Sequence, residues 1–156
     1  MKVFSIFYFL LIFTLIGCTT QKVPFQTGDI DLIAAVFAEN QKIHEGMLNE
    51  PPKLDFKSYF ASIEALSKSK DERILNWQKR LLEQFPKNAK DLDSTFNQIA
   101  QMAVILLEIK QQVSLPVEYK KFYCPMVDKY WVSSDKFVRN PYASEMRDCG
   151  EQVTEE

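Results

Sequence analysis

The chain has 156 residues, with 19 basic and 21 acidic side chains and a formal net charge of −2. Binding to nucleic acid rests on a positive surface that neutralises phosphates, so this charge balance argues against a nucleic-acid partner. Without its N-terminal targeting segment, the chain has the length of one domain and can bury a core without needing cross-links or metals.

Residues 1–17 have the features of a bacterial secretory signal. Lys2 precedes a largely apolar stretch, Val3–Ile16, which is shorter than the roughly 20 residues that a membrane-spanning helix needs. The end of the segment resembles the lipobox of bacterial lipoproteins, in the sequence Leu15, Ile16, Gly17 and Cys18. That resemblance implies cleavage before Cys18 and acylation of this residue, and more than one acyl chain gives stable anchoring.

Two alternatives to a lipoprotein stay open, namely a cleaved signal with an incidental Cys18 and an uncleaved anchor helix. The residues after the cysteine are Thr19, Thr20 and Gln21, without the aspartate that resembles an inner-membrane retention signal. We therefore expect a protein anchored by lipid in the outer membrane of the cell envelope and facing the periplasm. Residues 18–28 are expected to form the lipidated N-terminus and its tether.

Four stretches between residues 29 and 115 place apolar residues at helical spacing. The apolar positions are Ile30, Ile33, Ala34, Phe37, Met47 and Leu48; Phe56, Tyr59, Phe60, Ile63 and Leu66; Ile74, Trp77, Leu81, Leu82 and Phe85; and Phe96, Ile99, Ala103, Leu106, Leu107 and Val113. Candidate helix caps are Thr27 or Asp29, Asp55, Asp71 and Asp91, while Pro51, Pro52, Pro86 and Pro116 mark the ends.

No sustained period of two occurs before Pro116, so the sequence does not predict a sheet there. Four amphipathic helices with short connections predict an all-α fold, an antiparallel four-helix bundle within a domain of residues 29–156. From about residue 117 the chain is rich in aromatic residues and contains Pro125 and Pro141, so we expect an irregular C-terminal arm packed on the bundle. Ordering such an arm costs about 1 kcal/mol per residue, which its aromatic rings, its cysteines or a bound ion must offset.

The arm has an ordered set of residue types spread over its length. These are Cys124, Pro125, Met126, Trp131, Arg139, Asn140, Pro141, Tyr142, Met146, Cys149 and Gly150. This order resembles the pattern of a family of bacterial exported proteins catalogued as domain of unknown function number three-three-four-seven. Members look like helical bundles, alone behind a signal or appended to periplasmic adaptor subunits of heavy-metal efflux systems. The resemblance implies copper or silver handling, with metal-efflux or other envelope proteins as partners.

The chain departs from the family in two ways. Members often have a histidine directly before Cys-Pro-Met, where this chain has Tyr123, and the stretch between Met126 and Trp131 is shorter than is usual in the family. The first departure removes the nitrogen ligand that this position supplies in the family, and the second changes the geometry of the loop. The remaining sulfur set of Cys124, Met126, Met146 and Cys149 is soft and favours Cu(I) or Ag(I) over hard cations. These two ions are the only cofactors that the sequence indicates.

A disulfide between Cys124 and Cys149 is the competing interpretation, because exported proteins reach compartments where disulfides persist. Met126 and Met146 would then be flexible core filler. Two free thiols are the third possibility, and disulfide and metal site could also be two redox states of one switch.

The remaining motifs indicate structural roles. Asn140 can close an Asx turn before Tyr142, and Arg139 can bond a carboxylate or a helix end, although ligand recognition by Arg139 is the alternative. His44 is the only histidine, and a lone histidine is more often packed than a ligand. With no second histidine and no glycine-rich phosphate loop, we expect no enzyme and assign no catalytic residue.

Two hypotheses of function follow from the sequence. In the first, an envelope lipoprotein binds copper or silver through the sulfurs of its arm and serves metal efflux. In the second, a metal-independent interaction module presents a helical domain whose arm is held by a Cys124–Cys149 disulfide.

Overall fold

The computed structural model describes residues 23–86 and 91–154. The predicted signal peptide and the lipidation site Cys18 lie outside these residues. Within the described ranges, no helix combines the length and the apolar character needed to cross a bilayer. The elements are α1 (Thr27–Met47), α2 (Lys57–Ala65), the 3₁₀ turn η1 (Leu66–Lys68), α3 (Glu72–Gln84), α4 (Leu92–Lys110), β1 (Lys120–Cys124), β2 (Lys129–Ser133), the 3₁₀ turn η2 (Ser144–Met146) and β3 (Glu151–Gln152).

The four predicted helices are confirmed, and so are the predicted caps of α3 and α4, whereas α2 begins after Phe56 rather than at Asp55. The Asp71 side chain accepts a hydrogen bond from the backbone N–H of Arg73, at the start of α3. Asp91 does the same for Ser94 at the start of α4. These caps satisfy amide groups that the first turn of a helix leaves without a partner. Helix α1 instead begins after Gln26 and has no side-chain cap.

The helices bury a continuous apolar core. Its largest fully buried side chains are Phe37, Met47, Tyr59, Ile63, Ile74, Leu81, Met102 and Leu106. They come from all four helices, and the pairs Tyr59/Ile63, Ile74/Leu81 and Met102/Leu106 have the four- and seven-residue spacings that put side chains on one face of a helix. The predicted apolar stripes therefore form the interior of the domain.

The all-α prediction is wrong, because the C-terminal arm contains a three-stranded antiparallel sheet with strand order β2-β1-β3. Strands β1 and β2 form a hairpin in which Phe122 lies opposite Trp131 and Tyr123 opposite Tyr130. Strand β3 pairs with the other edge of β1. The arm beyond residue 117 is thus not irregular throughout, because its three strands form regular structure.

The sequence of the hairpin has local features of β-structure, but they lie after Pro116, outside the region in which a period of two was assessed. Its two strands, β1 and β2, are each five residues long and contain two aromatic residues, a composition that is typical of strands. The turn between them contains no glycine, and Asp128 supplies the left-handed conformation with φ 50°, which aspartate tolerates better than most residues. Pairing the strands satisfies backbone groups that an irregular arm would leave without partners.

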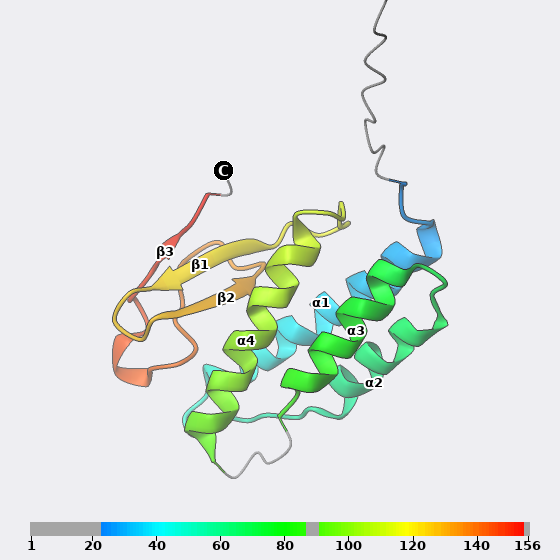
Figure 1. Ribbon diagram of the computed structural model, residues 1–156. Coiled ribbons are helices and arrows are strands. Elements are labelled where there is room, and N and C mark those ends of the chain that lie inside the picture. Colours follow the sequence, from blue (N-terminus) through cyan, green and yellow to red (C-terminus); the bar gives the residue numbers. More distant parts are fainter. Residues whose placement is uncertain (1–22, 87–90, 155–156) are drawn as a thin grey trace, which may run out of the picture.

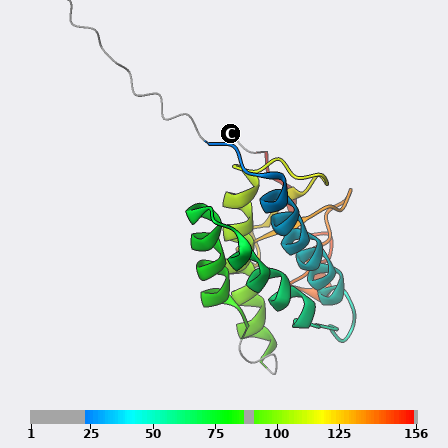
Figure 2. The same ribbon diagram turned by 90° about the vertical axis from the view of Figure 1, so that its right-hand side faces the viewer.

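The sheet lies beside the helices, and Figures 1 and 2 show it on one side of the helical layer. Helices α4 and α1 pack against β2, and Val132 belongs to the helical core. A second, smaller core consists of Phe122, Cys124 and Trp131. The chain after β2 closes this second core, which sets the position of the site described next.

Candidate binding groove beside the disulfide-linked arm

Cys124 and Cys149 form a disulfide, with an S–S distance of 2.04 Å and a Cα–Cα distance of 5.6 Å. Cys124 is the last residue of β1 and is fully buried, whereas Cys149 is half-buried in the arm. Val138 packs on the same small core as the bond. The disulfide interpretation of the sequence is confirmed, and it links the end of the arm to the sheet.

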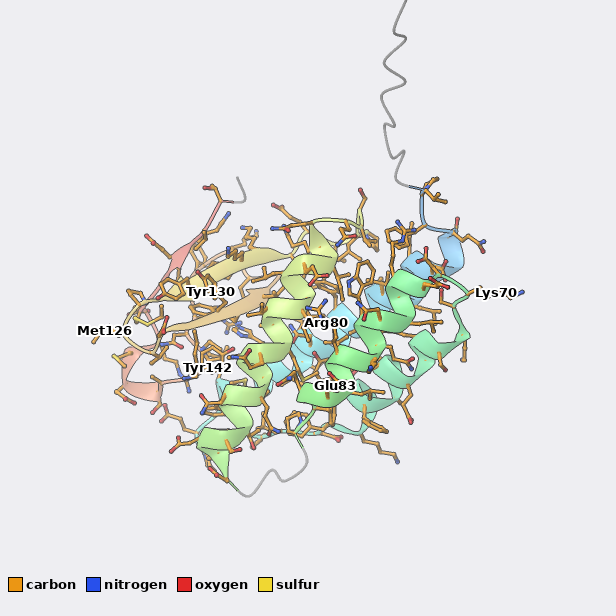
Figure 3. The ribbon with its side chains drawn as sticks, in the orientation of Figure 1. Lys70, Arg80, Glu83, Met126, Tyr130 and Tyr142 are labelled. Atoms are coloured by element: carbon orange, nitrogen blue, oxygen red, sulfur yellow. A yellow bond between two sulfur atoms is a disulfide. The ribbon has the colours of Figure 1, made fainter. Side chains whose placement is uncertain are left out.

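The four predicted metal ligands differ in oxidation state and in exposure to solvent. Both cysteine sulfurs are in the disulfide, so neither is a thiolate that could bind an ion. Met126 is 72% exposed at the hairpin turn and points away from the body of the molecule (Figure 3). Met146 is half-buried in η2, where its carbonyl oxygen accepts a hydrogen bond from the N–H of Cys149. Across residues 23–86 and 91–154, no three His, Cys, Asp or Glu side chains cluster as a metal site.

The Arg139-Asn140-Pro141-Tyr142 motif builds the turn that the sequence predicts. The Asn140 side-chain oxygen accepts a hydrogen bond from the N–H of Tyr142 at 3.0 Å, which is the expected Asx turn. The Tyr142 hydroxyl then donates to the carbonyl oxygen of Tyr130 at 2.8 Å. The motif fastens the chain to β2.

The guanidinium of Arg147 holds the next part of the arm. It donates to the carbonyl oxygens of Asn140 at 2.8 Å and of Met47 at 3.3 Å. Met47 is the last residue of α1, where the helix dipole favours a positive charge. Charge-assisted hydrogen bonds of this kind are among the stronger ones in proteins.

His44 is buried, and its Nε2 lies 3.1 Å from the Oδ2 of Asp135. Burial lowers the pKa of His44 more than the nearby Asp135 carboxylate raises it, so the ring is neutral at pH 7 and Nε2 donates to the carboxylate. Burial raises the pKa of Asp135, but the hydrogen bond from Arg139 and the pairing with His44 outweigh it, and the net pKa lies below its usual value. The pair joins α1 to the loop after β2, as predicted for a packed histidine.

A groove runs along the arm between three segments of the chain. Two cavities of about 430 and 440 Å³ share Asp93, Phe96, Tyr142, Ala143 and Glu145, so they lie next to each other. One end is lined by the loop between α1 and α2, and the other end by the hairpin residues Val127 and Lys129. The rings of Phe96 and Tyr142 meet edge to face in the floor, with centroids 6.1 Å apart. The labelled Tyr142 lies between the hairpin and α4 (Figure 3).

The groove depends on the position of the arm. Its wall consists of residues 141–147, which lie between the Asx turn and the disulfide, while the first turn of α4 and residues 49–52 supply the opposite side. Concave sites with an apolar floor and a few polar groups are the usual form of binding sites. The groove is therefore the best candidate for a functional site within the described residues.

The sequence did not predict the groove, and it did not predict Asp135 as the partner of His44. Asp135 lies 91 residues from its partner, and no local pattern connects them. Phe96, assigned to a core stripe, is only partly buried, because its helix begins at the edge of the domain. The acidic residues of the groove come from three separate segments, so only the fold brings them together.

Searches against family models, curated proteins and solved structures find no match to this chain.

Proposed function

We propose that this protein is a lipid-anchored, metal-independent interaction module of the cell envelope, whose groove binds a segment of another protein. The observation that supports this proposal best is the Cys124–Cys149 disulfide. It removes both candidate thiolate ligands, and it fastens the arm that forms one wall of the groove. A disulfide also suits the oxidising compartment to which the signal-like N-terminus would direct the chain.

The position of the groove fits an anchored protein. The described chain begins at Val23, a few residues after the predicted lipidation site Cys18. In Figure 1 this end and the start of α1 lie at the upper right, whereas the end of α1 and the start of α4 lie toward the lower left. A helix rises 1.5 Å per residue, so the 21 residues of α1 separate the two ends by about 30 Å. The groove, which includes Met47, therefore lies at the opposite end of α1 from the tethered end of the chain.

Site-specific photo-crosslinking in living cells tests this function. A crosslinking amino acid at Leu92, a 41% exposed residue of the groove, should join the protein to one discrete envelope protein. The matched control is Leu75 on α3, which is 37% exposed and outside the groove. The proposal also expects the Leu92 product to be lost when Cys124 and Cys149 are both replaced by serine. The same crosslinked proteins in the same amounts at Leu92 and at Leu75 would argue against a specific interaction at the groove.

A soft-metal role is the second candidate, and the spacing of the sulfurs along the chain favours it. Met126 is two residues from Cys124, and Met146 is three residues from Cys149 and hydrogen-bonded to it. After reduction, Cys124 and Cys149 would offer two thiolates, and with the thioethers of Met126 and Met146 they form a set of ligand types that suits Cu(I) or Ag(I). Titrating reduced protein with Cu(I) against a chelator tests this role. If the native chain and the variant with Cys124→Ser and Met126→Leu bind Cu(I) with equal affinity, the soft-metal role is ruled out.

A further inference from the structure

The rim of the groove is acidic. Glu50, Asp93 and Glu145 line it, all three are exposed, and none forms an ion pair with another described residue. The two basic lining residues are already engaged. Arg147 donates to two backbone carbonyls, and the Nζ of Lys129 donates to a carbonyl of the hairpin turn at 3.3 Å. Both cations keep their charge, but the three carboxylates outnumber them, so the groove lining has a net charge of 2 − 3 = −1.

Apolar side chains lie between these carboxylates. Leu92 exposes 41% of its surface there, next to the partly buried rings of Phe96 and Tyr142. Exposed leucine beside aromatic rings gains from being covered by an apolar side chain. The carboxylates are spread along the groove, since Glu50 lies at the α1–α2 loop and Glu145 in the shared middle.

From this arrangement we propose that the groove binds an extended protein segment in which apolar residues alternate with lysine or arginine. The apolar side chains cover Leu92, Phe96 and Tyr142, and the basic ones meet the carboxylates of the rim. Charge complementarity of this kind selects partners and speeds their association. The inference rests on the proposed function, because it names the chemistry of the partner for that same groove.

Three labelled synthetic peptides test the inference with the purified, oxidised mature protein. The first alternates lysine with leucine and tyrosine, the second replaces every lysine by glutamate, and the third replaces every leucine and tyrosine by serine. Fluorescence anisotropy measures their binding at low and at physiological salt. We expect the first peptide to bind at least about tenfold more tightly than either of the others, and its affinity to fall with added salt.

Charge reversal on the protein locates the site. The double variant with Glu50→Lys and Glu145→Lys should bind the lysine and leucine peptide at least about tenfold more weakly, because two attractions become repulsions. The control Glu83→Lys makes the same type of change at an exposed position of α3, outside the groove (Figure 3), and should leave binding unchanged. Circular dichroism checks that both variants keep the native helix content.

Three results would overturn the inference. They are equal affinity for the three peptides, an equal loss in Glu83→Lys and in the double variant, and no binding of the first peptide at about 1 mM. The cellular crosslink at Leu92 separates this failure from that of the proposed function. If the crosslink forms while the peptides fail, the module stands and the assigned partner chemistry is wrong.

Discussion

Arg147 in the C-terminal arm donates a hydrogen bond to the carbonyl oxygen of Met47, a residue 100 positions earlier in the chain. The bond joins the arm to the last residue of α1. Together with the disulfide and the Asx turn, it fixes the segment that forms one wall of the groove. Removing any of these links should loosen that wall before it unfolds the helices.

Replacing Arg147 by methionine keeps an apolar stem and removes the guanidinium. We expect the free energy of unfolding to fall by about 1.5 to 3 kcal/mol, the usual range for hydrogen bonds to charged groups. The control is Arg80→Met, which breaks a partly exposed ion pair with Glu108 and should cost about 1 kcal/mol or less. Urea denaturation of both variants measures the difference. Equal losses would contradict a special role of Arg147 in holding the arm.

The disulfide should contribute to stability by restricting the unfolded chain. It closes a loop with a sequence separation of 25, for which the chain-entropy model gives about 3.5 kcal/mol. Urea unfolding with and without a reducing agent measures this contribution. The variant with both Cys124→Ser and Cys149→Ser is the control, because its stability should not respond to the reducing agent. A native protein that is equally stable before and after reduction would show that the bond does not restrain the arm.

Gly150, next to the disulfide, occupies a conformation that other residues rarely adopt. Its φ is +133°, and a Cβ atom there would lie 2.7 Å from the Trp131 ring and 2.9 Å from the Tyr123 carbonyl oxygen. We expect Gly150→Ala to destabilise the protein by about 1 to 3 kcal/mol.

Gly28 in the first turn of α1 is the matched control, since nothing lies within 4 Å of a Cβ built there. Gly28→Ala should be neutral or should stabilise by up to about 1 kcal/mol, because alanine favours the helix. Thermal unfolding followed by circular dichroism compares the two variants. A Gly150→Ala protein as stable as the native chain would rule out close packing at the end of the arm.

His44 should make stability depend on pH in one defined window. Burial lowers the pKa of His44 in the folded protein below its ordinary value of 6.5. As the pH falls, the unfolded chain therefore binds a proton at a higher pH than the folded chain does. The contribution of the neutral ring is therefore fully present above about pH 6.5 and decreases as the pH falls toward the lowered value. Unfolding free energies measured between about pH 7 and pH 5 should decrease with acidification.

The variant His44→Gln tests the assignment, since His44 is the only histidine of the chain. It should have a nearly flat profile over this range. Asp135 does not interfere, because its pKa is below its ordinary value of 3.8, and its effect on stability occurs at lower pH. An equally steep profile in His44→Gln would assign the dependence to other groups.

The helices of this fold could be predicted from the sequence because their signals are local. An apolar stripe and a capping aspartate lie within one segment, as Asp71 and α3 illustrate. The sheet also had local signals in the aromatic runs of β1 and β2, but the surrounding prolines favoured an irregular interpretation. Strand β3 pairs only Glu151 and Gln152 with β1, and such a short polar strand has no pattern of its own.

The candidate site could be predicted only in part. The pairing of Cys124 with Cys149 was one of several open alternatives, because spacing alone does not show whether two sulfurs meet. The groove needed the fold, since Glu50, Phe96 and Glu145 lie in separate segments that share no sequence signal. Residues whose role depends on long-range packing are the ones that a single sequence leaves undetermined.

The state of the two cysteines in the native envelope tests the central claim most directly. Protein isolated from its own membrane is denatured, treated with a thiol-alkylating reagent before and after reduction, and mapped by mass spectrometry of its peptides. The account predicts no alkylation of Cys124 or Cys149 before reduction and complete alkylation of both afterwards. Alkylation of both residues before reduction, with copper present in near-stoichiometric amount, would contradict a disulfide-held interaction module.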